Sequence, residues 1–201
     1  MKLFLTSTGL SSPKIIEGFL KILNGVPEKT CALVIAYGQN EIEEFYIEES
    51  KKQVQNLGIN TTSLNMQDSF EINELPNFDV MYVCGGNTFS ILNKMREVRI
   101  DEFIKSEVAR GAIYVGVSAG SIIAGPSIEI AGWGTGGDEN EIGLEDLIGF
   151  GFTNIAVSPH FDIYSQKEEI EEFKKKVNYT VQELTDEQAL VILDSDKYII
   201  N

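Results

Sequence analysis

Apolar runs of strand length alternate with amphipathic segments over the first two thirds of the chain. A run such as Cys31–Ala36, which has no polar interruption, is typical of a strand covered on both faces. Between these runs, apolar residues spaced three and four positions apart predict helices. Strand and helix in regular succession indicate an α/β fold, with a mostly parallel sheet and helices on both sides. The expected strands are 2–6, 31–36, 61–64, 79–84 and 113–117, and the expected helices are 14–23, 41–57 and 100–110, with a further helix that opens at 89.

The pattern is less regular beyond residue 123. A helix is expected over 166–177, with Glu–Lys pairs at i,i+4 spacing on its solvent face, 171 with 175 and 172 with 176. Turn residues separate several short apolar runs near the end of the chain. The expected short strands are 128–131, 154–158, 181–184, 189–193 and 197–200.

A glycine-rich loop is expected over Gly132–Asn140. It contains the single tryptophan of the chain, Trp133. Loops of this length are often functional, so Trp133 is either a surface anchor for the loop or a lid residue over a substrate. The sequence does not separate the two interpretations.

The composition favours one domain over residues 1–201. Hydrophobic residues make up 43% of the chain, which is enough for a sizeable core at this length. The net charge is −15, from 16 Lys and Arg against 31 Asp and Glu. Nucleic acids and anionic membranes need clustered positive charge, so both are disfavoured as partners.

Cysteine usage and the N-terminal segment indicate a cytoplasmic protein. The two cysteines, Cys31 and Cys84, lie in or at the end of apolar runs, and we expect two buried, reduced thiols rather than a disulfide. The apolar segment Leu3–Leu5 is too short for a signal peptide. No stretch approaches the ~20 apolar residues that a membrane helix needs.

The segment Tyr114–Ser121 carries the pattern that best indicates chemistry. It contains Gly-x-Ser-x-Gly, with an apolar run before Ser118 and a polar-to-apolar run after it. In a nucleophile elbow a strand, a sharp turn and a helix expose the turn serine, whose neighbours are small because the turn is strained. A glycine-rich turn without chemistry is the alternative, since short motifs also match by chance.

His160 is the only histidine of the chain, and it follows the strand expected at 154–158. Sites of parallel α/β sheets form at the carboxyl ends of the strands, so Ser118 and His160 could meet above one edge of the sheet. A hydroxyl needs a base to remove its proton, and imidazole is the usual base. The alternative is a histidine that ends a strand and bonds only to backbone.

A carboxylate would complete the site by holding the imidazole in one tautomer. Asp186 and Glu187 follow the strand expected at 181–184, whereas Asp138 and Asp146 lie between the serine and the histidine. Acidic residues are abundant, and most are expected to be solvated surface charge. Spacing alone does not choose among them.

The turn Gly85–Thr88 leaves one expected strand and enters a helix. Glycine N–H groups can approach an oxygen that becomes negative during attack on a carbonyl, so this turn is a candidate oxyanion hole, with Ala119 N–H as second donor. A structural or phosphate-binding turn is the alternative, although the lysine of a P-loop is missing. Cys84 precedes the turn as a rival nucleophile, but a cysteine that ends a strand is more often part of the core.

Three segments together resemble the peptidase E family of serine peptidases, which are aspartyl dipeptidases with cyanophycinase as a relative. They are Val83–Phe89, Gly116–Ser121 and Ser158–Phe161, and they span much of the chain in the family's order. The resemblance implies a three-layer α/β/α sandwich akin to class I glutamine amidotransferases, with a flavodoxin-like sheet. It also implies a Ser-His-Glu/Asp triad.

Carried over residue by residue, the resemblance implies Ser118 as nucleophile and His160 as base. The acid of the family lies near the C-terminus in a leucine-x-acid context, which Leu184-Thr185-Asp186 matches, so the resemblance favours Asp186. It implies Gly86 and Ala119 as oxyanion donors. Substrate contacts are expected from three further residues, which are Asn87, Thr88 and Lys167.

One departure concerns the substrate. The aspartyl dipeptidases hold the substrate's aspartate with an arginine beyond the histidine segment, whereas the arginines here, Arg96, Arg99 and Arg110, all precede the elbow. The segment after His160 offers Lys167, which cannot copy the two-pronged contact of a guanidinium group. Aspartyl specificity is thus implied by the resemblance without the residue that would supply it.

The expected function is hydrolysis of short peptides, with dipeptides as the implied substrates, by a monomer or homodimer. No metal or organic cofactor is expected, because no His/Cys cluster has ligand spacing. An esterase-like acyl hydrolase acting on a non-peptide substrate is one alternative. A binding protein with an inactive site is the other.

Overall fold

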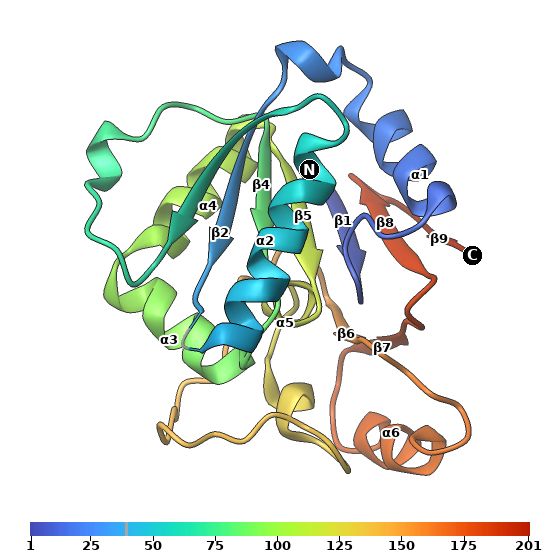
Figure 1. Cartoon of the computed structure of the whole chain (residues 1–201). Helices are drawn as coiled ribbons and strands as arrows, with labels where there is room; N and C mark the ends of the chain where they lie inside the picture. The colour runs from blue at the N-terminus through green and yellow to red at the C-terminus, as the bar shows by residue number, and fades with distance from the viewer. Residues whose placement is uncertain (39) are drawn as a thin grey trace.

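A seven-stranded sheet runs through the molecule in the order β3-β2-β4-β5-β1-β8-β9 (Figure 1). The computed structural model describes residues 1–38 and 40–201. The first five strands of that order pair in parallel, and β8 and β9 add an antiparallel edge beside β1. The strands are β1 Lys2–Thr6, β2 Cys31–Ala36, β3 Asn60–Asn65, β4 Val80–Val83, β5 Ile113–Val117, β8 Ala189–Leu193 and β9 Asp196–Ile200.

Helices cover both faces of this sheet, which confirms the predicted α/β fold. Successive residues of a strand point to opposite faces, so Leu3 and Leu5 enter one core while Phe4 enters the other. The first core lies against α3 Thr88–Glu97, α4 Ile100–Arg110 and α5 Ala119–Ile123. The second lies against α1 Pro13–Leu23 and α2 Glu41–Gln55.

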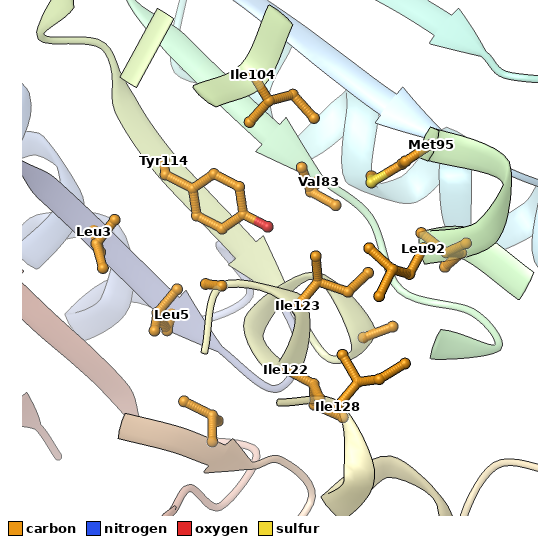
Figure 2. Close-up of a cluster of buried hydrophobic side chains, with 14 of the residues drawn as sticks. Leu3, Leu5, Val83, Leu92, Met95, Ile104, Tyr114, Ile122, Ile123 and Ile128 are labelled. Carbon is orange, nitrogen blue, oxygen red and sulfur yellow. The ribbon is translucent and has the colours of Figure 1, made fainter. Parts of the chain in front are cut away.

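Tyr114 ties the core to the turn that follows β5 (Figure 2). Its ring is fully buried among apolar side chains that include Leu5, Val83 and Ile123. Its hydroxyl donates a hydrogen bond of 2.7 Å to the carbonyl oxygen of Gly120. Burial raises the pKa of Tyr114, so the phenol stays protonated and keeps this bond. The first turn of α5 is therefore held down onto the sheet.

A second, smaller unit lies beyond the carboxyl ends of β1 and β5, at the lower side of Figure 1. It consists of the parallel pair β6 Ile155–Ser158 and β7 Thr180–Glu183, with α6 Lys167–Lys174 between them in sequence. Because both strands run toward the same edge, the residues that follow β6 and β7 come close together. These residues include His160 and Asp186.

Particular residues set the ends of two helices. The side chain of Ser12 caps α1 by accepting from the N–H of Ile15, and Pro13 occupies the first turn. Gly111 ends α4 with φ 118°, a conformation that favours glycine. In the described part of the chain, three short 3-10 helices connect other elements, η1 Pro27–Lys29, η2 Ile72–Glu74 and η3 Glu129–Gly132.

The prediction of a strand at 128–131 is wrong, because most of this segment belongs to the 3-10 helix η3. Alternation of Ile128, Glu129 and Ile130 suggested a strand. In the structure Ile130 and its neighbour Ala131 are both buried, which a strand packed on one side does not allow. The N–H of Ala131 instead bonds to the carbonyl oxygen of Ile128 at 2.9 Å.

The helix predicted over 166–177 is shorter than expected, since α6 ends at Lys174. Glu171 pairs with Lys174, one residue before the predicted partner at 175. Lys174 also bonds to Glu183 of β7, and these two carboxylates raise its pKa. Lys176 lies over the ring of Trp133, 3.9 Å from its centroid, instead of pairing with Glu172.

The cysteine prediction is correct for one thiol only. Cys84 is buried, whereas Cys31, at the first position of β2, is exposed. The N–H of Cys31 binds the carboxylate of Asp79 at 2.9 Å, so the strand begins at the surface.

No helix in the described part of the chain is both long and apolar enough to cross a membrane.

Candidate active site

The backbone at Ser118 makes the sharp turn expected of an elbow. Its φ of 49° and ψ of −111° are rare for a residue with a side chain. The N–H of Ser118 bonds to the carbonyl oxygen of Thr6 in β1, at 2.9 Å, and its own carbonyl oxygen accepts the N–H groups of Ser121 and Ile122. Neighbouring structure thus holds the strained residue in place between β5 and α5.

Glycines on either side of Ser118 let α5 lie directly on β4 and β5. A Cβ atom at Gly120 would lie 2.3 Å from the carbonyl oxygen of Val83, and one at Gly116 would lie 2.7 Å from backbone atoms of Gly120. A Cβ atom at Gly85 would lie 3.1 Å from the Cβ atom of Ser118. The Gly-x-Ser-x-Gly pattern is therefore explained by close backbone packing below the serine.

The ring of His160 lies between Ser118 and Asp186. Its Nε2 atom is 3.0 Å from Ser118 Oγ, and its Nδ1 atom is 2.6 Å from Asp186 Oδ1. The three side chains come from the segments that follow β5, β6 and β7, and they are partly open to solvent. A carboxylate at Nδ1 places the proton there and leaves the lone pair of Nε2 toward the serine hydroxyl.

The geometry distinguishes the carboxylates that spacing left open. Asp186 is the one bonded to His160. Asp138 instead accepts the N–H of Thr88 at 2.8 Å, and Asp146 pairs with Arg96 at 3.4 Å. Glu187 follows Asp186 on the turn before β8.

Ser7 and Thr8 position the site and were missed in the sequence. The Ser7 hydroxyl accepts the N–H of His160 at 3.0 Å and donates to the carbonyl oxygen of Leu184 at 3.1 Å. The Thr8 hydroxyl donates to the carbonyl oxygen of Asp186 at 2.8 Å. Both follow β1, the neighbour of β5, so the rule that located Ser118 at a strand end could have located them too.

The glycine turn after β4 faces the elbow, with Gly86 at φ 134°. Among the described residues, the N–H groups of Gly86 and Ala119 have no hydrogen-bond acceptor, as donors awaiting an oxyanion would require. The Asn87 side chain caps α3 by accepting from Ser90 N–H and also donates to the carbonyl oxygen of Glu139. Asn87 thus joins the turn to the glycine-rich loop.

Cys84 is a poor rival nucleophile. Burial raises the pKa of its thiol to about 12, so the reactive thiolate is scarce at neutral pH.

Among the described residues, no group of three or more His, Cys, Asp and Glu side chains could hold a metal ion.

Two hollows meet at Ser118, His160 and Asp138, which line both of them. The smaller, of about 130 Å³, lies toward α6 and is lined by Thr88, Trp133 and Asp138 among others. The larger, of about 870 Å³, lies toward α2 and includes the exposed rings of Phe45 and Tyr46 as well as Gly86 and Asn87. Lys167, an expected substrate contact, lines a different hollow with Phe161 and Glu171.

The glycine-rich loop is fastened to α6. Trp133 Nε1 donates to the carbonyl oxygen of Glu169 at 2.7 Å, and its ring packs at a tilt of 54° against the ring of Phe173. The Glu169 carboxylate accepts both the N–H and the hydroxyl of Thr135, at 3.0 and 2.8 Å. Trp133 is therefore an anchor for the loop and also a wall of the smaller hollow.

The chain is thus an α/β protein. A serine, a histidine and a carboxylate are bonded in series at the carboxyl edge of its sheet. The family model described as Peptidase family S51 matches residues 3–200. The chain therefore belongs to peptidase family S51.

Known relatives agree with this assignment. An uncharacterized peptidase of Listeria monocytogenes is 33% identical over 129 residues, which are 63% of this chain and 62% of that protein. Peptidase E of Salmonella arizonae is 27% identical over 164 residues, covering 79% of this chain and 68% of the relative. The crystal structure of a provisionally assigned peptidase E protein from Listeria monocytogenes EGD-e superposes with a TM-score of 0.81 at 25% identity, covering 98% of this chain and 96% of that one.

Proposed function

We propose that this protein is a serine peptidase that cleaves short peptides, with dipeptides as its simplest substrates. The observation that carries the proposal is the bonded series of Ser118 Oγ, the His160 ring and the Asp186 carboxylate. Membership of a peptidase family supports it independently of this geometry.

The proposed reaction begins when Ser118 Oγ attacks the scissile carbonyl carbon and His160 Nε2 takes the hydroxyl proton. Asp186 stabilises the resulting imidazolium ion through Nδ1–H. The N–H groups of Gly86 and Ala119 bind the carbonyl oxygen as it becomes negative. His160 then returns the proton to the leaving amine, and water releases the acyl group from Ser118 by the same steps in reverse order.

Aspartyl specificity, which the resemblance to peptidase E implies, finds little support around Ser118. No Lys or Arg is found among the described residues that line the two hollows meeting there. Arg96 donates instead to the carbonyl oxygens of Asp146 and Ile148. The contacts of Ser118, His160 and Asp186 thus support hydrolysis, whereas, in the described part of the chain, no cation near Ser118 supports recognition of a substrate aspartate.

A substrate panel tests the proposal. Asp-Leu, Ala-Leu and Leu-Leu are incubated with the protein beside p-nitrophenyl esters, and the release of leucine or nitrophenol is followed. We expect cleavage of at least one dipeptide, with a kcat/KM that disappears in a matched Ser118→Ala sample. Turnover of esters without cleavage of any peptide would replace the proposal with an esterase-like hydrolase, and turnover of neither would indicate a binding protein.

A further inference from the structure

The smaller hollow beside Ser118 has the size of one amino-acid side chain. Its volume of about 130 Å³ compares with the ~150 Å³ of an engineered cavity that accepts benzene. Ser118, His160, Asp138 and Glu169 are among the residues that line it. A peptide whose scissile carbonyl lies at Ser118 can therefore place the residue on the acyl side of that carbonyl here.

The permanent charges around this hollow are all negative. Asp138 and Glu169 are its acidic side chains, and no Lys or Arg is among the described residues of its wall. Lys176 lies over the ring of Trp133 and lines an adjacent hollow instead. A negative group entering beside Ser118 would meet repulsion that nothing in this wall offsets.

A buried hydroxyl in the same wall lacks a partner. Thr88 is fully buried, and its Oγ1 atom has no hydrogen bond within the described structure. The backbone N–H of Thr88 donates to the carboxylate of Asp138. The Thr88 hydroxyl and the Asp138 carboxylate are therefore on two residues that contact each other. Buried polar atoms are rarely left unpaired, and those that are call for an explanation. A polar group on a bound molecule would supply the missing hydrogen bond.

We propose that this hollow binds the N-terminal residue of the substrate, with its ammonium group at Asp138 and Thr88, and that it selects neutral or cationic residues against acidic ones. An ammonium group has three donors, which suit a carboxylate and a hydroxyl oxygen together. The side chain of an aspartyl residue brings a further carboxylate into a hollow that Asp138 and Glu169 line. The proposal rests on the peptidase function, and it reverses the charge preference that the resemblance implies.

Binding to catalytically disabled protein tests the pocket apart from the chemistry. In Ser118→Ala protein, titration calorimetry compares Asn-Leu with Asp-Leu, which are nearly the same size and differ by one charge. We expect Asn-Leu to bind at least tenfold more tightly, and Lys-Leu at least as tightly as Asn-Leu. Equal or tighter binding of Asp-Leu, or no binding of any of the three, would overturn the proposal.

A pair of variants locates the effect. Asp138→Asn removes one charge while its amide oxygen can still accept the Thr88 N–H, so the preference for Asn-Leu over Asp-Leu should fall at least threefold. Glu139→Gln removes the same charge at the next residue, which is outside the wall of the hollow, and should leave the preference unchanged. Equal effects of the two variants would contradict the assigned pocket, since net charge alone would then explain both.

The same substrates separate this proposal from the proposed function. Wild-type protein that cleaves Asp-Leu faster than Asn-Leu is a peptidase without the inferred preference. Protein that binds Asn-Leu selectively but cleaves no peptide has the inferred pocket without the proposed activity.

Discussion

Replacing Ser118 with alanine is expected to lower kcat/KM for the best dipeptide by at least ~10³-fold, because the attacking oxygen is lost while only binding and the oxyanion donors remain. The fold should be unaffected. The Ser118 hydroxyl bonds to the solvent-accessible ring of His160, and the turn is held by backbone hydrogen bonds to Thr6, Ser121 and Ile122. Steady-state kinetics and thermal unfolding of the same preparation measure both effects.

A serine elsewhere provides the control. Ser63 is exposed on β3, the edge strand farthest from β8 and β9, and Ser63→Ala should retain wild-type kinetics. Retention of most activity in Ser118→Ala would remove the serine mechanism. A fall of more than a few degrees in its midpoint of unfolding would show that Ser118 has a structural role that the hydrogen bonds do not reveal.

Replacing Gly120 with alanine is expected to give the largest loss of stability of any single methyl addition at the elbow. The added Cβ atom would lie 2.3 Å from the carbonyl oxygen of Val83, and that oxygen belongs to a central strand that cannot move aside. Overpacking usually costs about 1–3 kcal/mol, but a clash of backbone with a Cβ atom should cost ~4 kcal/mol or more. Chemical denaturation of the purified variant, or its failure to accumulate as folded protein, measures the effect.

The same substitution at Gly25 separates the clash from the general effect of alanine. A Cβ atom at Gly25 would lie 3.5 Å from its nearest neighbour, which is an ordinary contact, and Gly25 is exposed. Gly25→Ala should change the free energy of unfolding by less than ~1 kcal/mol. Comparable stability of the two variants would mean that α5 lies farther from β4 than the structure shows.

Local pattern was sufficient for most of the fold. Continuous apolar runs such as 31–36 and 113–117 are covered on both faces, and the helices between them have the expected periodicity. The segment 128–131 was assigned wrongly because alternation over four residues does not report whether a neighbouring strand exists. Burial of consecutive residues in η3 depends on tertiary packing, which the local pattern does not contain.

Part of the site could be predicted because strand ends of a parallel sheet share an edge. That rule predicted from the sequence that Ser118 and His160 lie close together. In the structure, Ser118 Oγ lies 3.0 Å from His160 Nε2. The carboxylate could not be chosen from spacing, since its position depends on the pairing of β6 with β7, a contact between distant segments. Lys167 was suggested by its place after His160, but it lines another hollow because it opens α6.

The central claim is that His160 activates the hydroxyl of Ser118, and covalent labelling tests it most directly. The folded protein is treated at neutral pH with a serine-directed fluorophosphonate, and the adduct is located by peptide mass spectrometry. We predict one adduct, on Ser118, that forms ~10²-fold or more slowly in His160→Gln, because proton removal by the base is lost. Absence of label on Ser118 in the wild-type protein, or labelling of His160→Gln at the wild-type rate, would contradict the account.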